Sequence, residues 1–133
     1  MAFGVTAVLA QDTIASRKQL MKANGDQAKV GSAMVKGDAP FDLAKAKAVF
    51  ATYADSAVKI TPMFPAGSHT GDTTAAPKIW EAKADFDAKL KKFGDDSKAA
   101  EAATKDLDSF KSQFGAVMRN CGGCHETYRI KKS

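Results

Sequence analysis

The residues best suited to chemistry lie together near the C-terminus, as Cys121-Gly122-Gly123-Cys124-His125. In a helix, spacings of three and four residues place both thiols and the imidazole on about one face. Covalent haem attachment needs this set, because two thiols add to the two vinyl groups and the imidazole beside the second thiol reaches the iron. The two glycines leave space for the porphyrin edge near the backbone. The segment therefore predicts one haem c, bound through Cys121 and Cys124, with His125 as an iron ligand.

Other uses of these cysteines fit less well. A zinc site needs a fourth ligand, and the only other histidine, His69, falls in a segment rich in loop-forming residues. A thioredoxin-like redox motif belongs to a βαβ context, which this chain lacks. A plain disulfide would leave His125 without a role. No catalytic triad, phosphate-binding loop or paired-carboxylate site stands out, so we expect no enzyme.

The elements that position this motif are predicted to be helices. With 133 residues, of which 44% are hydrophobic, the chain has the size and composition of one soluble domain. Alanine and lysine are abundant and β-branched residues sparse, which favours helix. We expect an all-α antiparallel four-helix bundle. Its helices would span about residues 12–36, 41–60, 77–93 and 99–130, with a long loop at 61–76 and a break at 94–97.

Apolar residues at helical spacing indicate the inward faces. In the first helix they recur every seven residues, although Gly25 and Gly31 weaken the prediction that this helix is continuous. The residues expected to face the core are Ile14, Met21, Ala28, Val35, Phe50, Ala54, Ala57, Trp80, Phe86, Leu90, Leu107, Phe110, Phe114 and Val117.

The N-terminus gives a signal about the compartment. Residues 2–10 are apolar and end in small residues before Gln11-Asp12, which resembles the end of a signal peptide without its basic start. We therefore divide the chain into a residual signal-like segment, 1–10, and a haem-binding four-helix-bundle domain, 11–133, and expect a periplasmic location. An ordinary N-terminus is the alternative.

The formal net charge of +5 suits contact with a redox partner protein that has an acidic surface. The lysines are spread out and no recognition motif accompanies them, so nucleic-acid binding is not expected. A solvated helix surface is the alternative role for these lysines.

Four segments together resemble the class II cytochromes c, the family of cytochrome c′. They are residues 17–22, Phe64-Pro65, Lys78-Ile79-Trp80 and the C-terminal 121–129. The resemblance covers nearly the whole chain after residue 10, and the attachment motif is its most specific part. It implies a helical bundle around one haem. Members of this family often form homodimers through their first two helices, and both a monomer and a homodimer stay open here.

The resemblance also implies roles for three residues. His125 would be the proximal ligand, and Arg129 would lie beside the proximal face of the haem. Arg17 resembles the family arginine that pairs with a haem propionate, a role that suits its rigid donor fork. For both arginines, a solvent-exposed surface position is the alternative.

Met21 decides between two functions that the resemblance allows. It follows Arg17 by one helical turn, so both can meet the same haem. If its sulfur coordinates the iron, the protein is a six-coordinate electron carrier, and the sequence around Met21 resembles that branch more closely. If Met21 only packs, a five-coordinate iron would bind NO or CO. Weak peroxidase activity would follow from a labile distal ligand. The other candidate sulfur donors are Met34, Met63 and Met118.

Overall fold

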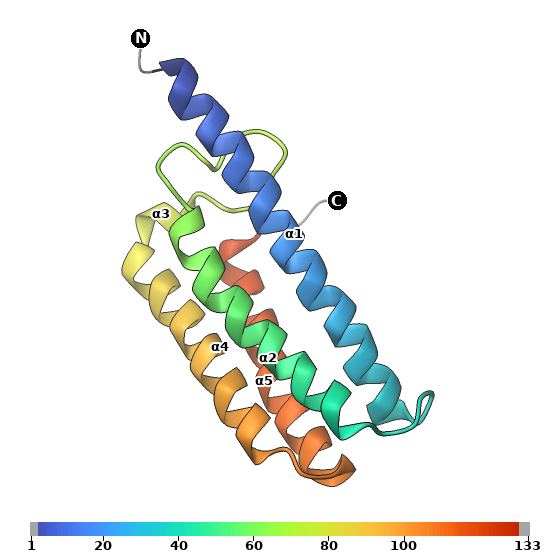
Figure 1. The fold of residues 1–133 in the computed structure, drawn as a ribbon. Coiled ribbons are helices and arrows are strands. Elements are labelled where there is room, and N and C mark those ends of the chain that lie inside the picture. Colours follow the sequence, from blue (N-terminus) through green and yellow to red (C-terminus); the bar gives the residue numbers. More distant parts are fainter. Residues whose placement is uncertain (1–2, 131–133) are drawn as a thin grey trace.

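Helices form most of the described part of the chain. The computed structural model describes residues 3–130, with side chains from residue 12 onward. Its elements are α1 (Phe3–Lys36), α2 (Leu43–Ile60), the 3-10 turn η1 (Thr61–Met63), α3 (Lys78–Glu81), α4 (Lys83–Ala103) and α5 (Leu107–Tyr128). Figure 1 shows that the long helices α1, α2, α4 and α5 alternate in direction and lie side by side, with the short α3 at one end. This confirms the all-α antiparallel four-helix bundle.

Local signals set the C-terminal end of α1 and the starts of α2 and α5. Gly37 ends α1 with a φ of 83°, a conformation that favours glycine. Asp42 caps α2 by accepting a hydrogen bond from the Lys45 backbone N–H at 3.0 Å. At the start of α5, the Asp106 side chain accepts from the Ser109 N–H and the Ser109 hydroxyl accepts from the Asp106 N–H, which makes a capping box.

The predicted break at 94–97 is wrong, because α4 continues to Ala103 and α5 begins only at Leu107. Gly94 is buried where α4 meets α2, and a Cβ there would lie 3.2 Å from the Ala57 Cβ. This glycine therefore permits close helix packing and does not end the helix. The helix predicted over 77–93 is also divided, since Ala82 leaves helical geometry between α3 and α4.

The start predicted for the first helix, near residue 12, also differs from the structure, in which α1 begins at Phe3. The helix then runs without interruption through Gly25 and Gly31. Its N-terminal part projects beyond the bundle (Figure 1). The division of the chain at residue 10 stays a prediction, and residues 1 and 2 lie outside the described part. Among residues 3–130, no helix is both long and apolar enough to cross a membrane.

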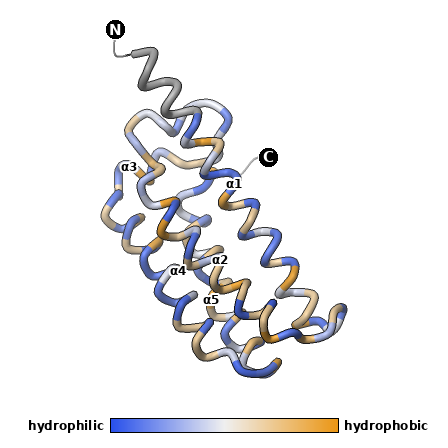
Figure 2. Tube along the Cα trace, in the orientation of Figure 1, coloured by the Kyte–Doolittle hydropathy of each residue, from blue (hydrophilic) through white to orange (hydrophobic). Residues whose placement is uncertain are grey.

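Two apolar clusters fill the bundle, and Figure 2 shows hydrophobic and hydrophilic positions alternating along each helix accordingly. The first cluster consists of Met34, Ala46, Val49, Phe50, Tyr53, Ala100, Phe110, Phe114 and Val117. The second consists of Ile60, Ile79, Phe86, Leu90 and Tyr128, with Leu20, Met63, Phe64, Ala75, Trp80, Ala82 and Cys124 packed against it. The second cluster lies at the end of the molecule where α3 and the long loop meet α5 (Figure 1).

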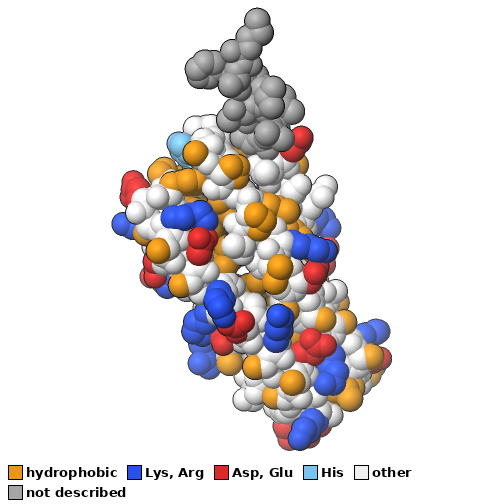
Figure 3. Space-filling view, turned by 60° about the vertical axis from the view of Figure 1, so that its left-hand side comes forward, with side chains coloured by type: hydrophobic (Ala, Val, Ile, Leu, Met, Phe, Trp, Pro, Cys, Tyr) orange, Lys and Arg blue, Asp and Glu red, His pale blue; other side chains and the backbone are white. Residues whose placement is uncertain are grey.

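Most of the predicted inward residues are buried. Met21, however, is 38% exposed, and Ala28, Val35, Trp80 and Leu107 are only half-buried. On the face seen in Figure 3, lysines and acidic residues are interspersed, and hydrophobic side chains gather toward the loop end.

Candidate haem-attachment site

The predicted attachment residues lie in the last two turns of α5. Cys121, Cys124 and His125 are all half-buried, and both cysteines are free thiols. The first half of α5 is anchored in the first cluster through Phe110 and Phe114. Because the helix continues unbroken to Tyr128, the spacing of three and four residues holds the two thiols and the imidazole on one side of α5.

The local environment favours the neutral forms of the Cys121 and Cys124 thiols and of the His125 imidazole. Burial raises the pKa of the Cys121 and Cys124 thiols, and for Cys124 the charge of Lys89 opposes part of this rise. Burial, followed by the positive charge of Arg129, lowers the pKa of His125. A neutral imidazole is the form that ligates a metal. The site therefore presents two free thiols and, beside the second one, an imidazole whose neutral form can ligate a metal.

An apolar surface adjoins the second thiol. Cys124 packs against the second cluster, which also receives Leu20 from α1 and Phe86 from α4. The rings of Phe86 and Tyr128 meet edge to face, with their centroids 5.2 Å apart. Side chains from three helices thus exclude water from one side of the attachment segment, as a haem with a tuned potential requires.

The end of α5 is tied to the long loop. The Ala76 N–H donates to the Tyr128 carbonyl at 3.0 Å, and the Ile130 N–H donates to the Thr74 carbonyl at 2.7 Å. An isolated antiparallel bridge pairs Ala75 with Arg129. Sequence reasoning missed this pairing, since nothing in residues 74–76 indicates a strand. Its effect is to fix the backbone just beyond His125.

Arg17 is buried in the structure, with 4% of its surface exposed. Its Nη1 donates to the Met63 carbonyl at 3.1 Å, and its Nη2 donates to the Ser68 carbonyl at 2.8 Å. The Ser68 and Thr73 hydroxyls accept further hydrogen bonds, at 2.9 and 3.1 Å, and the guanidinium lies 4.7 Å from the centre of the Phe64 ring. The surface alternative for Arg17 is therefore wrong. Its pairing with a propionate stays a prediction, and Ser68 and Thr73 are partners that sequence reasoning missed.

Met21 differs from the other candidate sulfur donors in its surroundings. Met34 is 2% exposed within the first cluster, Met63 packs against the second cluster, and the Met118 sulfur accepts a hydrogen bond from the Tyr53 hydroxyl at 3.6 Å. The Met21 sulfur has one polar neighbour, the Asn24 amide nitrogen at 4.0 Å. Asn24 is itself buried and accepts a hydrogen bond from Ser56 at 2.9 Å.

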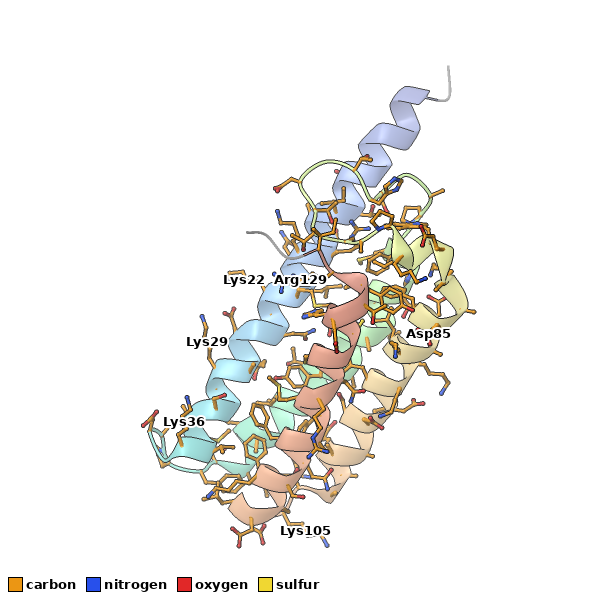
Figure 4. The ribbon with its side chains drawn as sticks, turned by 180° about the vertical axis from the view of Figure 1, so that it is seen from behind. Lys22, Lys29, Lys36, Asp85, Lys105 and Arg129 are labelled. Atoms are coloured by element: carbon orange, nitrogen blue, oxygen red, sulfur yellow. The ribbon has the colours of Figure 1, made fainter. Side chains whose placement is uncertain are left out.

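Arg129 follows the last residue of α5 and is exposed, beside α1 (Figure 4). Its Nε donates to the Thr74 hydroxyl at 3.4 Å. Because its charge lowers the pKa of His125, the guanidinium lies close enough to influence the predicted ligand. His69 is exposed, and its ring centroid lies 5.2 Å from that of Trp80.

The residues present fit a covalently bound haem. Two thiols and a neutral imidazole share one side of a helix, an apolar cluster adjoins them, and a thioether on α1 stays outside the core. No cluster of three or more His, Cys, Asp or Glu side chains suited to a metal ion occurs in the described part of the chain.

Comparison with known proteins gives the same result. The sequence model of the family described as "Cytochrome C′" matches residues 12–129. The chain is 44% identical to the cytochrome c′ of Rhodopseudomonas palustris over 96% of its length and 88% of that protein. It is 38% identical to the cytochrome c-556 of Agrobacterium fabrum, covering 95% of this chain and 86% of that protein.

A solved structure of a Rhodopseudomonas palustris cytochrome c′ has the same fold. It superposes with a TM-score of 0.89 at 45% identity, covering 92% of this chain and 98% of that one. Fold, attachment motif and sequence agree over almost the full length. The chain therefore belongs to the cytochrome c′ family, and it carries a single haem c attached through Cys121 and Cys124.

Proposed function

We propose that this protein is a periplasmic one-electron carrier whose iron is held by His125 and Met21. The observation that carries this proposal is the state of Met21. The chain buries or engages Met34, Met63 and Met118, whereas Met21 keeps 38% of its surface exposed, one turn from the buried Arg17. A methionine that the protein leaves outside its own core is available to coordinate the haem iron.

Haem c supplies one iron that takes up and returns a single electron. The surrounding residues suit that use. A thioether is a soft donor that favours ferrous iron, so Met21 and His125, which would hold the iron, would raise the midpoint potential. The second cluster excludes water, which limits solvent rearrangement when the charge changes. Neither effect needs a catalytic residue, and we accordingly propose no enzymatic activity.

The alternative is a five-coordinate iron that binds NO or CO. The Met21 sulfur has a single polar neighbour at 4.0 Å, so the described protein does not clamp it in one position. A thioether that stays off the iron would leave a vacant distal site. The relatives include a protein named cytochrome c′ and one named cytochrome c-556, and the names alone do not separate the two functions.

The ferric spin state separates them. We expect the purified holoprotein to be low-spin near neutral pH and, once reduced, to bind CO slowly or poorly. Met21→Ala should make it high-spin and open to CO. The matched control is Met63→Leu, which removes a sulfur close to the second cluster and should leave the spectrum unchanged. A high-spin unmodified protein, or loss of the low-spin spectrum only with Met63→Leu, would overturn the assignment of Met21.

The periplasmic part of the proposal rests on residues 2–10, which resemble the end of a signal peptide. N-terminal sequencing of the haem-containing protein from a periplasmic fraction tests it. A mature chain that begins near Gln11 is the expected result. Haem protein recovered only from the cytoplasm would contradict the proposal.

A further inference from the structure

A groove between α4 and α5 opens beside the attachment segment. Its volume is about 520 Å³. The side chains that matter here are Lys89, Lys92 and Asp96 from α4 and Arg119, Asn120 and Cys124 from α5. Figure 4 shows these two helices side by side. The groove therefore leads from solvent directly to the second thiol.

The charge of this groove is positive, with three cations and one carboxylate. Asp96 is already engaged, because Lys92 Nζ lies 2.5 Å away and the Asn120 amide donates to it at 3.0 Å; both hydrogen bonds lower its pKa. Within the described residues, no salt bridge joins Lys89 or Arg119 to a carboxylate. Within the groove, Lys89 and Arg119 therefore carry charges that no salt bridge among the described residues offsets, whereas Lys92 is paired with Asp96.

The charge reaches the attachment segment. Lys89 and Cys124 line the same groove from opposite helices, α4 and α5. Gly122 and Gly123 are both exposed, and a Cβ at either position would meet no other atom within 4 Å. A partner can therefore approach the backbone between the two thiols without displacing a side chain. Since electron tunnelling weakens steeply with distance, such an approach favours rapid transfer.

We propose that this groove is the docking surface for a redox protein whose own electron-carrying centre is surrounded by carboxylates. The inference rests on the proposed electron-carrier function and names where the partner binds. Lys89 and Arg119 attract the acidic rim, and the Gly123–Cys124 backbone is the point of entry. One electron passes from the reduced partner to the oxidised protein, or in the reverse direction, and no covalent bond forms or breaks.

Electron-transfer kinetics of the holoprotein test this surface. The protein probe is reduced plant-type ferredoxin, a small acidic protein, mixed with the ferric protein in a stopped-flow instrument at low ionic strength. Lys89→Glu together with Arg119→Glu should slow the bimolecular step by about tenfold or more, since electrostatic steering changes association rates by factors of 10 to 1,000. In the same variant, most of the dependence of this rate on salt concentration should disappear.

The control variant, Lys29→Glu with Lys36→Glu, makes the same change in net charge on the outer edge of α1, where Figure 4 labels both residues. We expect its rate to fall by less than about threefold, because screening weakens charges far from the contact. The cationic oxidant tris(phenanthroline)cobalt(III) should react with the reduced groove variant at least as fast as with the unmodified protein.

The outcomes separate the two proposals. The docking proposal would be overturned if the rate of electron transfer from ferredoxin fell equally in the groove and α1 variants. It would also be overturned if the rate fell in neither. Slow electron transfer between the unmodified protein and both probes, ferredoxin and the cobalt complex, would instead overturn the electron-carrier function. Lys89→Gln with Arg119→Gln repeats the test with a smaller change of charge, and about half of the logarithmic effect is expected.

Discussion

At the scale of single residues, Arg17 connects the candidate site to the loop that covers it. Its four hydrogen bonds, to residues 46 to 56 positions away, hold the loop against α1. Arg17→Ala leaves the Met63 and Ser68 carbonyls without these donors. We expect the free energy of unfolding of the holoprotein to fall by about 3 kcal/mol, measured by denaturant titration. If Arg17 pairs with a haem propionate, as the family resemblance implies, the midpoint potential should shift as well, because that charge is lost.

Lys91→Ala is the control for Arg17. Lys91 is exposed and pairs with Asp95 of the same helix, so its removal should change the unfolding free energy by less than about 0.5 kcal/mol. Arg17→Lys keeps the positive charge but loses the forked donor geometry of the guanidinium. Its midpoint potential should therefore lie closer to that of the unmodified protein than its free energy of unfolding does. Equal potential shifts for Arg17→Ala and Lys91→Ala would contradict a role of Arg17 toward the haem.

The two kinds of site residue differ in how far the sequence predicts them. Cys121, Cys124 and His125 follow from the sequence because their chemistry depends on spacing within one helix. The surroundings of Arg17 depend on the path of a loop some 50 residues away. Pro, Gly, Ser and Thr in residues 61–76 predict a loop but not where it folds, so Ser68 and Thr73 could not be identified as partners.

At the scale of elements, two glycines of α1 have opposite roles. A Cβ on Gly31 would lie 2.5 Å from the Phe114 ring, whereas one on Gly25 would meet nothing within 4 Å. Gly31→Ala should therefore destabilise the protein by about 1–3 kcal/mol through overpacking between α1 and α5. Gly25→Ala should stabilise it by about 0.5–1 kcal/mol, because alanine loses less backbone entropy in a helix. Thermal unfolding of both variants checks the pair, and a stabilising Gly31→Ala would contradict this packing.

The same reasoning explains the errors in the predicted helices. The sequence Gly94-Asp95-Asp96-Ser97 has the composition of a turn, yet Gly94 serves helix contact and the two aspartates pair with Lys91 and Lys92 one turn earlier. Such uses are visible only once the neighbouring helix is placed. The sequence did contain a signal for the boundary between α4 and α5, since Asp106, three residues before Ser109, forms a capping box at the start of α5. The four long helices and their antiparallel order were predicted correctly because periodicity depends on the whole segment, whereas the separate short helix α3 was not predicted.

Tyr128 joins the end of α5 to α4 through a hydrogen bond from its hydroxyl to the Asp85 carboxylate. This bond and the negative charge of Asp85 raise the pKa of Tyr128 to about 12, from an ordinary value of 10.0. A raised pKa means that the folded state favours the protonated tyrosine. Its contribution to stability is therefore complete below pH 10 and is lost as the pH rises toward 12.

Asp85→Asn should lower the pKa of Tyr128 toward 10, because the carboxylate charge is removed. NMR titration of tyrosine labelled with ¹³C at Cζ resolves the effect, since the chain has two tyrosines. The second, Tyr53, serves as the internal control: burial raises its pKa, and Asp85 is not among the causes. An unchanged Tyr128 titration would show that the hydrogen bond is absent in solution.

At the scale of the whole molecule, the two apolar clusters occupy two ends of the bundle that differ in whether they border the haem-attachment residues. The first cluster contains Phe50, Phe110 and Val117, each at most 2% exposed, and packs α1, α2, α4 and α5 without the attachment residues. The second borders Cys124 and takes in the loop and α3. The first end is thus built from the chain alone, whereas the second adjoins the cofactor.

This division predicts how the protein responds when the haem is not attached. Cys121→Ala with Cys124→Ala should abolish acid-stable haem and sharply lower the yield of folded protein, because a ligand that binds only the native state stabilises it. In the surviving fraction, hydrogen exchange should accelerate most around Phe86 and Tyr128 of the second cluster. Amides around Phe50 and Phe110 should retain more of their protection, because local stability follows local packing.

The unmodified protein is the reference for this comparison, and its haem should remain on the polypeptide after acid–acetone extraction. A second variant, His125→Ala, keeps both thiols, so it should retain attached haem while its spectrum changes. It therefore separates loss of the iron ligand from loss of the covalent bonds. Uniform loss of protection across both clusters would mean that the bundle unfolds as one unit and that the first cluster also depends on the cofactor. Haem that is extractable from the unmodified protein would contradict covalent attachment.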